Sequence, residues 1–401
     1  MKYAKHISSF LLLAASLLIL AACGQKSNCS GISFGGGSGG SSGGGLSGPG
    51  SVCGAGSGNG GGSGNGASTD LLYYLGGGTV IDAAGVTGTT FANLAGYTPT
   101  AFPNGTQLGL NFWIENKKFL YVPATEASGG GEVLGYVINR ATGALTPIGA
   151  GNFATSTINA DEAVGDPQGR FLYVADSAHG TIAVFKVDSA TGALTASGSP
   201  MQTNAGPTHM TVDGTGTYLY FASGGDVFGF NIDQTSGTLT PLTNSPYNVQ
   251  MRTVYADPAG KFLLGIPLLG DANVYVIPIG LGTGILGVPT AFPTVQAPAD
   301  LALSPTGKFL FTFSVDSSNR PLPIEGFTFD DTAGTVTEMT SSPFVNLPKV
   351  NTGIFDQNGG TLLGVTTTSF FVYSVDSTTG TPTSPIPSLG VAHDERYAFT
   401  N

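Results

Sequence analysis

Charged side chains are scarce in this sequence of 401 residues, where they make up 10% of the total. Basic residues are the scarcer kind: 14 Lys and Arg stand against 25 Asp and Glu, and the formal net charge is −11. A nucleic-acid-binding surface needs a basic patch to meet the phosphates. The charge balance therefore argues against a nucleic-acid partner.

Cysteine is limited to three residues, and none follows Cys53. Nothing in the region from Asp70 onward therefore depends on the redox state. The sequence also lacks the G-x-S-x-G, H-E-x-x-H, P-loop and Cys/His zinc patterns. We expect no cofactor and no bound metal.

Glycine is abundant, with 63 residues, and no long amphipathic helical stretch is present, which together indicate an all-β protein. The sequence repeats a turn that is followed by a strand with alternating faces. The segment "DPQGRFLYVAD" at Asp166 returns as "DGTGTYLYFA" at Asp213, "DPAGKFLLGI" at Asp257 and "SPTGKFLFTF" at Ser304, with a looser copy, "ENKKFLYVP", at Glu115. One copy predicts a turn and a strand, whereas a regular series predicts a repeat architecture.

An aromatic residue or Leu follows each turn and fixes the period of about 47 residues. These anchor residues are Phe119, Phe171, Tyr218, Phe262, Phe309, Leu362 and Tyr397. A second signal follows most anchors by about 20 to 25 residues, for example "ATGALTA" at Ala190 and "TSGTLTP" at Thr235. We interpret each unit as four strands, with this Thr-Gly or Ser-Gly turn as the hairpin between the third and the fourth. Four-stranded units that repeat at this period predict a β-propeller.

Seven segments precede the anchors, and they predict seven inner strands and therefore seven blades. They are "LGLNFWIEN", "ADEAVGDPQG", "PTHMTVDGTG", "MRTVYADPAG", "ADLALSPTG", "VNTGIFDQNG" and "LGVAHDE". The last unit stops soon after its anchor, so its outer strands must come from the N-terminal side, and we expect the two ends of the chain to pair and close the ring. Residues 71–75 and 396–401 both look like the second strand of this closing blade, and the sequence leaves both alternatives open.

The chain begins with two lysines and the apolar run "LLLAASLLIL", which is too short for a comfortable membrane span. The run ends in "LAAC", which resembles a bacterial lipobox and implies a lipid on Cys23 after cleavage before it. Gly24 favours the outer membrane or cell surface over the inner membrane. We expect a signal peptide at 1–22, a Gly/Ser-rich flexible tether at 23–69 and the propeller, as a monomer, at 70–401. Cys29 and Cys53 in the tether either form one disulfide or remain two free thiols.

"FLYVAD…TIAVFKVDSATGALTASGSP" resembles the lactonase-type seven-bladed propellers, the family of bacterial 6-phosphogluconolactonase and the YVTN-repeat surface proteins. The resemblance covers about residues 70–401. It implies a small-molecule lactone as the ligand and a site at the rim of the central channel. It is specific for the fold and less specific for activity, because one fold carries many functions.

Polar residues of the predicted inner strands are the candidates for the site, because those strands line the channel. They are Asp161, Glu162, Thr208, His209, Arg252, Asp300, Lys349, Asn351, His393 and Asp394. Asp161, Glu162 and Asp300 offer oxygen ligands for a divalent cation, although their spacing matches no calcium loop, and solvated rim carboxylates are the alternative.

The segment "AGPTHMTVD" resembles the family segment Gly-Pro-Arg-His-Met, which carries two residues implicated in the lactonase site. His209 matches, whereas Thr208 stands in place of the Arg. The resemblance implies that His209 is a general base for water attack on a lactone carbonyl, with Arg252 as the partner of the developing oxyanion. The structural alternative is a half-buried His that is hydrogen-bonded between blades.

Two functions remain open. The first is hydrolysis of a lactone, and an unphosphorylated sugar lactone suits an acidic, lipid-anchored protein better than a phosphorylated one. The second is a non-catalytic module that binds a glycan, a protein or a cell-wall component at the cell surface.

Overall fold

The computed structural model describes residues 70–76, 80–87, 90–92, 94–103, 105–356 and 358–383 and the strands at 389–390 and 393–399. The predicted signal peptide and tether, with Cys23, Cys29 and Cys53, lie outside these residues. Every regular element in the described part is a β-strand, which confirms the all-β prediction. No helix there is long and apolar enough to cross a membrane.

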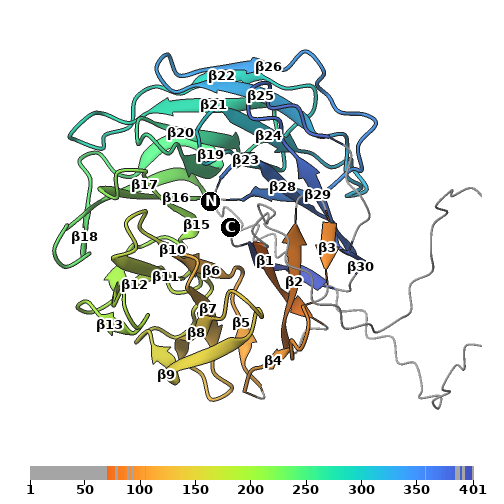
Figure 1. The fold of residues 1–401 in the computed structure, drawn as a ribbon. Coiled ribbons are helices and arrows are strands. Elements are labelled where there is room, and N and C mark those ends of the chain that lie inside the picture. Colours follow the sequence, from red (N-terminus) through yellow and green to blue (C-terminus); the bar gives the residue numbers. More distant parts are fainter. Residues whose placement is uncertain are drawn as a thin grey trace, which may run out of the picture. The chain divides into compact units, whose positions relative to one another are not determined.

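The strands form six antiparallel sheets, which stand as blades around a common centre in the arrangement of a propeller (Figure 1). The first sheet holds β1 (Asp70–Gly76), β2 (Val80–Thr87), β3 (Thr90–Ala92), β4 (Thr100–Ala101) and β31 (His393–Phe399). The second holds β5 (Gln107–Leu108), β6 (Trp113–Glu115), β7 (Phe119–Thr125), β8 (Gly131–Ile138) and β9 (Leu145–Ala154). The third holds β10 (Glu162–Gly165), β11 (Phe171–Asp176), β12 (Thr181–Val187), β13 (Leu194–Ala196) and β14 (Met201–Gln202).

The fourth sheet is the largest, with eight strands. It holds β15 (Thr208–Val212), β16 (Tyr218–Ser223), β17 (Gly225–Ile232), β18 (Leu239–Pro241), β19 (Tyr247–Ala256), β20 (Phe262–Pro267), β21 (Asn273–Pro278) and β22 (Thr290–Pro293). The fifth holds β23 (Asp300–Leu303), β24 (Phe309–Phe313), β25 (Glu325–Asp330) and β26 (Thr335–Glu338). The sixth holds β27 (Thr352–Phe355), β28 (Thr361–Val365), β29 (Ser369–Ser374) and β30 (Leu389–Gly390).

The sheets differ from the predicted set of separate four-stranded units in two ways. β19 runs unbroken from a pairing with β17, at Tyr247, to a pairing with β20, at Ala256, so two predicted units share one sheet. Several outermost strands are also split, since β13 and β14 pair side by side with β12. The segment "SGSP" lies between them, and Pro has no N–H to donate to a sheet.

The first sheet corrects the predicted last unit. β31 pairs with β1, and the strand order β3-β2-β1-β31 gives β31 the edge place that inner strands hold in other sheets. β1 is therefore the second strand, and Tyr397 does not begin one, because it lies inside β31 opposite Tyr74. Only part of "LGVAHDE" belongs to β31, since β30 pairs with β29 as an outer strand.

The repeated turn is held together by its first residue, which is buried. Asp213 Oδ1 accepts hydrogen bonds from the backbone N–H groups of Thr217 (2.8 Å) and Tyr218 (2.6 Å). Asp257 Oδ1 accepts from the residues at the same spacing, Lys261 and Phe262, both at 2.7 Å. Hydrogen bonds to a charged group contribute about 1.5–3 kcal/mol each, so this residue joins the inner strand firmly to the second.

The two signals of the sequence repeat meet each other across neighbouring units. The anchor Phe171 of β11 packs beneath Gly237, the glycine of the next unit's Ser-Gly turn, where an added Cβ would lie 2.5 Å from the ring. Two residues further on, the Tyr173 hydroxyl donates to the Gly237 carbonyl oxygen at 3.2 Å. Phe119 and Tyr121 hold Gly192 in the same way, with the Tyr121 hydrogen bond at 2.7 Å. The aromatic residues of the pattern "FLY" therefore contact the turn glycine of the next unit.

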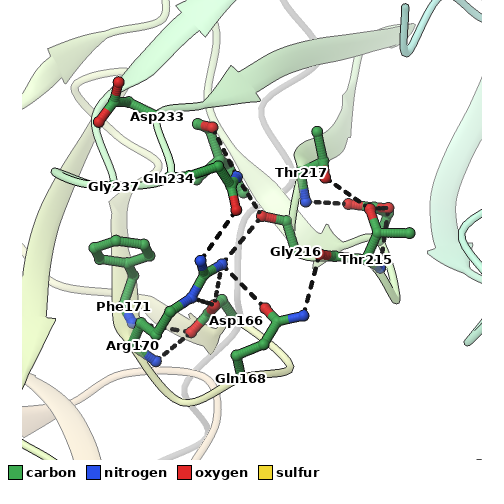
Figure 2. A network of polar contacts seen from close by, with 12 residues as sticks. Asp166, Gln168, Arg170, Phe171, Thr215, Gly216, Thr217, Asp233, Gln234 and Gly237 are labelled. Carbon is green, nitrogen blue, oxygen red and sulfur yellow. Dashed lines mark hydrogen bonds and ion pairs between the residues drawn. The ribbon is translucent and has the colours of Figure 1, made fainter. Parts of the chain in front are cut away.

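Arg170 adds a polar connection at the same interface (Figure 2). Its guanidinium pairs with Asp166 at 2.7 Å, lies over the Phe171 ring at 5.1 Å and donates to Gln234 Oε1 of the next unit at 3.0 Å. Its Nη2 also reaches the Gly216 carbonyl oxygen, at 3.4 Å. One side chain thus joins the turn of its own unit to two loops of its neighbour.

Gly237→Ala is expected to lower the stability more than Gly282→Ala does. Both glycines lie in turns with positive φ (+78° and +70°), where Ala costs roughly 1–2 kcal/mol. A Cβ at Gly282 meets nothing within 4 Å, whereas a Cβ at Gly237 meets Phe171 and adds about 1–3 kcal/mol of overpacking. Chemical denaturation of the two variants measures the difference. Equal losses would show that the ring–glycine contact is not tight.

Candidate functional site

One position is polar on six successive inner strands or at their starts, four residues before the first residue of each turn. The residues are Asn111, Glu162, His209, Thr253, Asp300 and Thr352. Every inner strand runs towards its turn in the same sense, so these residues lie at one level of the ring. Glu162, His209 and Asp300 were predicted from the sequence. Asn111, Thr253 and Thr352 were not, although counting back four residues from each turn identifies them.

Most of these side chains connect neighbouring inner strands. Asn111 binds the backbone of Ala163 twice, with Nδ2 donating to its carbonyl oxygen (2.7 Å) and Oδ1 accepting from its N–H (2.9 Å). Asp300 accepts from the Tyr255 hydroxyl at 2.5 Å on one side and from the Thr352 hydroxyl on the other. These polar side chains therefore join neighbouring inner strands by hydrogen bonds, and we call them staples.

His209 departs from this pattern. Its side chain is exposed, and no hydrogen bond joins the imidazole to another residue in the described part of the chain. Its backbone is in the left-handed region, with φ +50°. It lies in a β-bulge, because the register between β15 and β16 shifts between Thr208 and Thr211. Bulges often occur beside active sites, where they redirect a side chain.

Arg252 occupies a second bulge on the next inner strand. The register between β19 and β20 shifts between Met251 and Thr253, so Arg252 is the extra residue. Its side chain is exposed, and Nη2 donates to the carbonyl oxygens of Pro298, at 3.2 Å, and Ala299. The inner strands β10, β23 and β27 pair with their second strands without such a shift.

The charges of Asp300 and Arg252 both act on His209. Loss of hydration among the surrounding strands lowers the pKa of His209, Asp300 opposes this change, and Arg252 adds to it. The net result is a pKa below 6.5, so the imidazole is neutral at neutral pH. A neutral, exposed imidazole beside a guanidinium can accept a proton while the cation stabilises negative charge.

Glu162 holds the backbone of His209. Its two carboxylate oxygens accept from the N–H groups of His209 (2.7 Å) and Met210 (2.9 Å). Desolvation raises the pKa of this half-buried carboxyl to about 7, the two backbone hydrogen bonds oppose that increase, and the Asp161 charge adds to it. Asp161 itself accepts from Ser177, from the N–H at 2.7 Å and from the hydroxyl at 2.6 Å.

The remaining predicted site residues take other places. The Thr208 hydroxyl donates to the Ala222 carbonyl oxygen at 3.1 Å. Lys349 is exposed and Asn351 half-buried, and both precede β27, whose residue Thr352 makes the bond to Asp300 instead. His393 and Asp394 lie in β31, and their side chains are outside the described residues. Within the described part, no three His, Cys, Asp or Glu side chains gather to hold a metal ion.

The environment of His209 predicts opposite effects of two substitutions on its pKa. Asp300→Asn is expected to lower the pKa of His209 further, and Arg252→Gln to raise it, because each removes one of the two opposing charges. Titration of the imidazole by NMR, with His179 as the reference in each variant, measures both shifts. Shifts of equal sign would show that these charges do not act on His209.

Residues 109–255 match the family model described as "Lactonase, 7-bladed beta-propeller". No curated protein matches the sequence. A proposed 6-phosphogluconolactonase from Bacteroides fragilis has a similar structure, with a TM-score of 0.65 and 18% identity over 84% of this chain and 99% of that one. The periplasmic gluconolactonase PpgL from Pseudomonas aeruginosa gives a TM-score of 0.61 and 17% identity, over 82% of this chain and 98% of its own. Residues 109–255 therefore resemble the lactonase-type seven-bladed propellers, and the solved structures share the propeller fold with this chain.

Proposed function

We propose that the protein hydrolyses a lactone, with His209 as the general base and Arg252 as the cation for the oxyanion. The observation that carries this proposal is the arrangement of these two residues. Each lies in a bulge of an adjacent inner strand, each side chain is exposed, and His209 alone of the polar ring is exposed and makes no hydrogen bond through its side chain.

The reaction follows from those two groups. His209 takes a proton from a water molecule, whose oxygen attacks the lactone carbonyl carbon. The carbonyl oxygen becomes negatively charged, and the Arg252 guanidinium stabilises it. The ring C–O bond then breaks, and the leaving oxygen takes the proton from His209. The product is a hydroxy acid, and no redox change occurs.

An unphosphorylated sugar lactone is the substrate class that we favour. The net charge of −11 disfavours a phosphorylated anion. Thr208, in the position of the family's Arg, binds a backbone carbonyl and supplies no positive charge for a phosphate. The periplasmic gluconolactonase among the proteins of this fold acts on a sugar lactone by its name, which agrees with this class.

We also propose the cellular setting and the complete form of the ring. The lipobox-like "LAAC" supports attachment to a bacterial membrane through Cys23, with a monomeric propeller on a flexible tether at the outer membrane or cell surface. The double role of β19 supports seven blades in place of six sheets. The β1–β31 pairing supports closure of the ring by the two ends of the chain.

The alternative is a non-catalytic module that binds a glycan or a cell-wall component. Two observations favour it: Glu162 and Asp300 are already occupied as staples, and the family's Arg is absent at Thr208. Such a module would keep the ring and need no base at His209.

Acid release from a panel of phosphorylated and unphosphorylated aldonolactones and simple γ- and δ-lactones, measured with the purified protein, tests the proposal. His209→Ala is expected to lower kcat/KM by roughly 10²–10⁴-fold, and Arg252→Ala by roughly 10²–10³-fold. His179→Ala is the control, because His179 pairs with Asp176 at 2.8 Å, away from the inner strands. Absence of turnover on every lactone would favour the binding module.

A further inference from the structure

We propose that Glu162 is the positioning residue for His209: its carboxylate holds the bulge that directs the imidazole, and its ionisation controls the activity of the site. This inference rests on the proposed function, since it concerns the same base. Glu162 is on β10 and His209 on β15, so one inner strand sets the backbone of the next.

Two N–H groups of β15 point to the same carboxylate of Glu162. Successive N–H groups of a regular strand point to opposite sides, so one carboxylate cannot accept from both. At His209, φ is +50°, which brings its N–H and that of Met210 to the same carboxylate, at 2.7 and 2.9 Å. The left-handed conformation costs a residue other than Gly roughly 1–3 kcal/mol, so it needs a partner that stabilises it. Glu162 is that partner.

The preceding strand provides a comparison within the molecule. Asn111 occupies the position in its unit that Glu162 occupies in the next one. Its side-chain amide binds the N–H and the carbonyl oxygen of Ala163. β10 is regular at that point, so one donor and one acceptor suffice. The bulge in β15 presents two donors, which require two acceptor oxygens. The carboxylate of Glu162 therefore matches the bulge, whereas an amide matches the regular strand.

Protonation of Glu162 removes one of those acceptors. The groups that face this carboxyl are the N–H groups of His209 and Met210 and the charge of Asp161, and together with burial they bring its pKa to about 7. Above this pH both hydrogen bonds are at full strength, and below it one oxygen becomes a donor that opposes an N–H. Desolvation lowers the pKa of His209 instead, and the Glu162→Gln variant distinguishes the two titrations.

Kinetics of the full-length protein with Glu162→Gln test the inference. The variant keeps one acceptor and places an NH₂ group against the other N–H, so kcat is expected to fall about 10- to 100-fold, as for a misplaced catalytic group, with KM within about twofold of wild type. In wild type, kcat/KM is expected to fall as the pH falls through about 7, because Glu162 becomes protonated. In the variant this step of the pH profile is expected to disappear, while the step caused by His209 remains.

Glu325→Gln is the matched control. Glu325 is buried, its pKa is raised chiefly by desolvation, and its carboxylate accepts from two consecutive N–H groups, those of Val295 (2.7 Å) and Gln296 (3.0 Å). It lies in β25, outside the inner strands, so its substitution is expected to leave kcat/KM and the pH profile unchanged. An equal loss in both variants would overturn the inference, because the effect would then be general destabilisation.

NMR of the His209 imidazole gives an outcome that does not depend on turnover. In wild type its resonances are expected to move as Glu162 titrates near pH 7, and in Glu162→Gln they are expected to start from a different position and lack that step. If no lactone is hydrolysed but these changes occur, the proposed reaction fails and the positioning role holds. Unchanged resonances, or a wild-type kcat/KM in Glu162→Gln, would overturn it. The wild-type titration decides the matter even if the variant does not fold.

Discussion

The contact between an aromatic ring and a turn glycine of the next unit is the constraint on which the rest of the structure depends. Phe171 fits beneath Gly237 with no room for a Cβ, and Tyr173 fixes the same glycine by its carbonyl oxygen. Full burial of such a ring contributes about 1.5–3 kcal/mol, so this contact helps to hold each unit against its neighbour. A ring of units held in this way has rigid walls, and polar groups near its centre take fixed positions.

The inner strands show how structure and function compete for the same residues. A polar side chain at one level of the ring can bind the next strand or remain available to a ligand. Asn111 and Asp300 bind the neighbouring strand. His209 does not, and its backbone is instead held by Glu162. The proposed site therefore lies where the series of staples is interrupted, and the interruption coincides with the two bulges.

The sequence predicted the features that depend on local chemistry. The turns, the anchors from Phe119 to Phe309 and the propeller arrangement follow from residues near one another in the chain, and the structure confirms them. The contact between the anchors and the turn glycines was not predictable, because the two signals meet only across units. The bulges at His209 and Arg252 have no signature in composition, so the sequence could not show how these two side chains are presented. Residues 71–75 and 396–401 both have the alternation of a second strand, so the sequence left their places open, and the pairing of β1 with β2 and β31 assigns that place to β1.

The pairing of β1 with β31 has a consequence for the order in which the protein is made. β31 follows every other described strand in the chain, whereas β1 precedes them all. During synthesis β1 and β2 can form a hairpin early, but the other edge of β1 remains without its partner until β31 has emerged. An unpaired strand edge is a template for association with other chains. Among the described strands, β1 therefore has an unpaired edge for the longest time. Aggregation through this edge is avoided only if the nascent chain stays separated from other copies until β31 pairs with it.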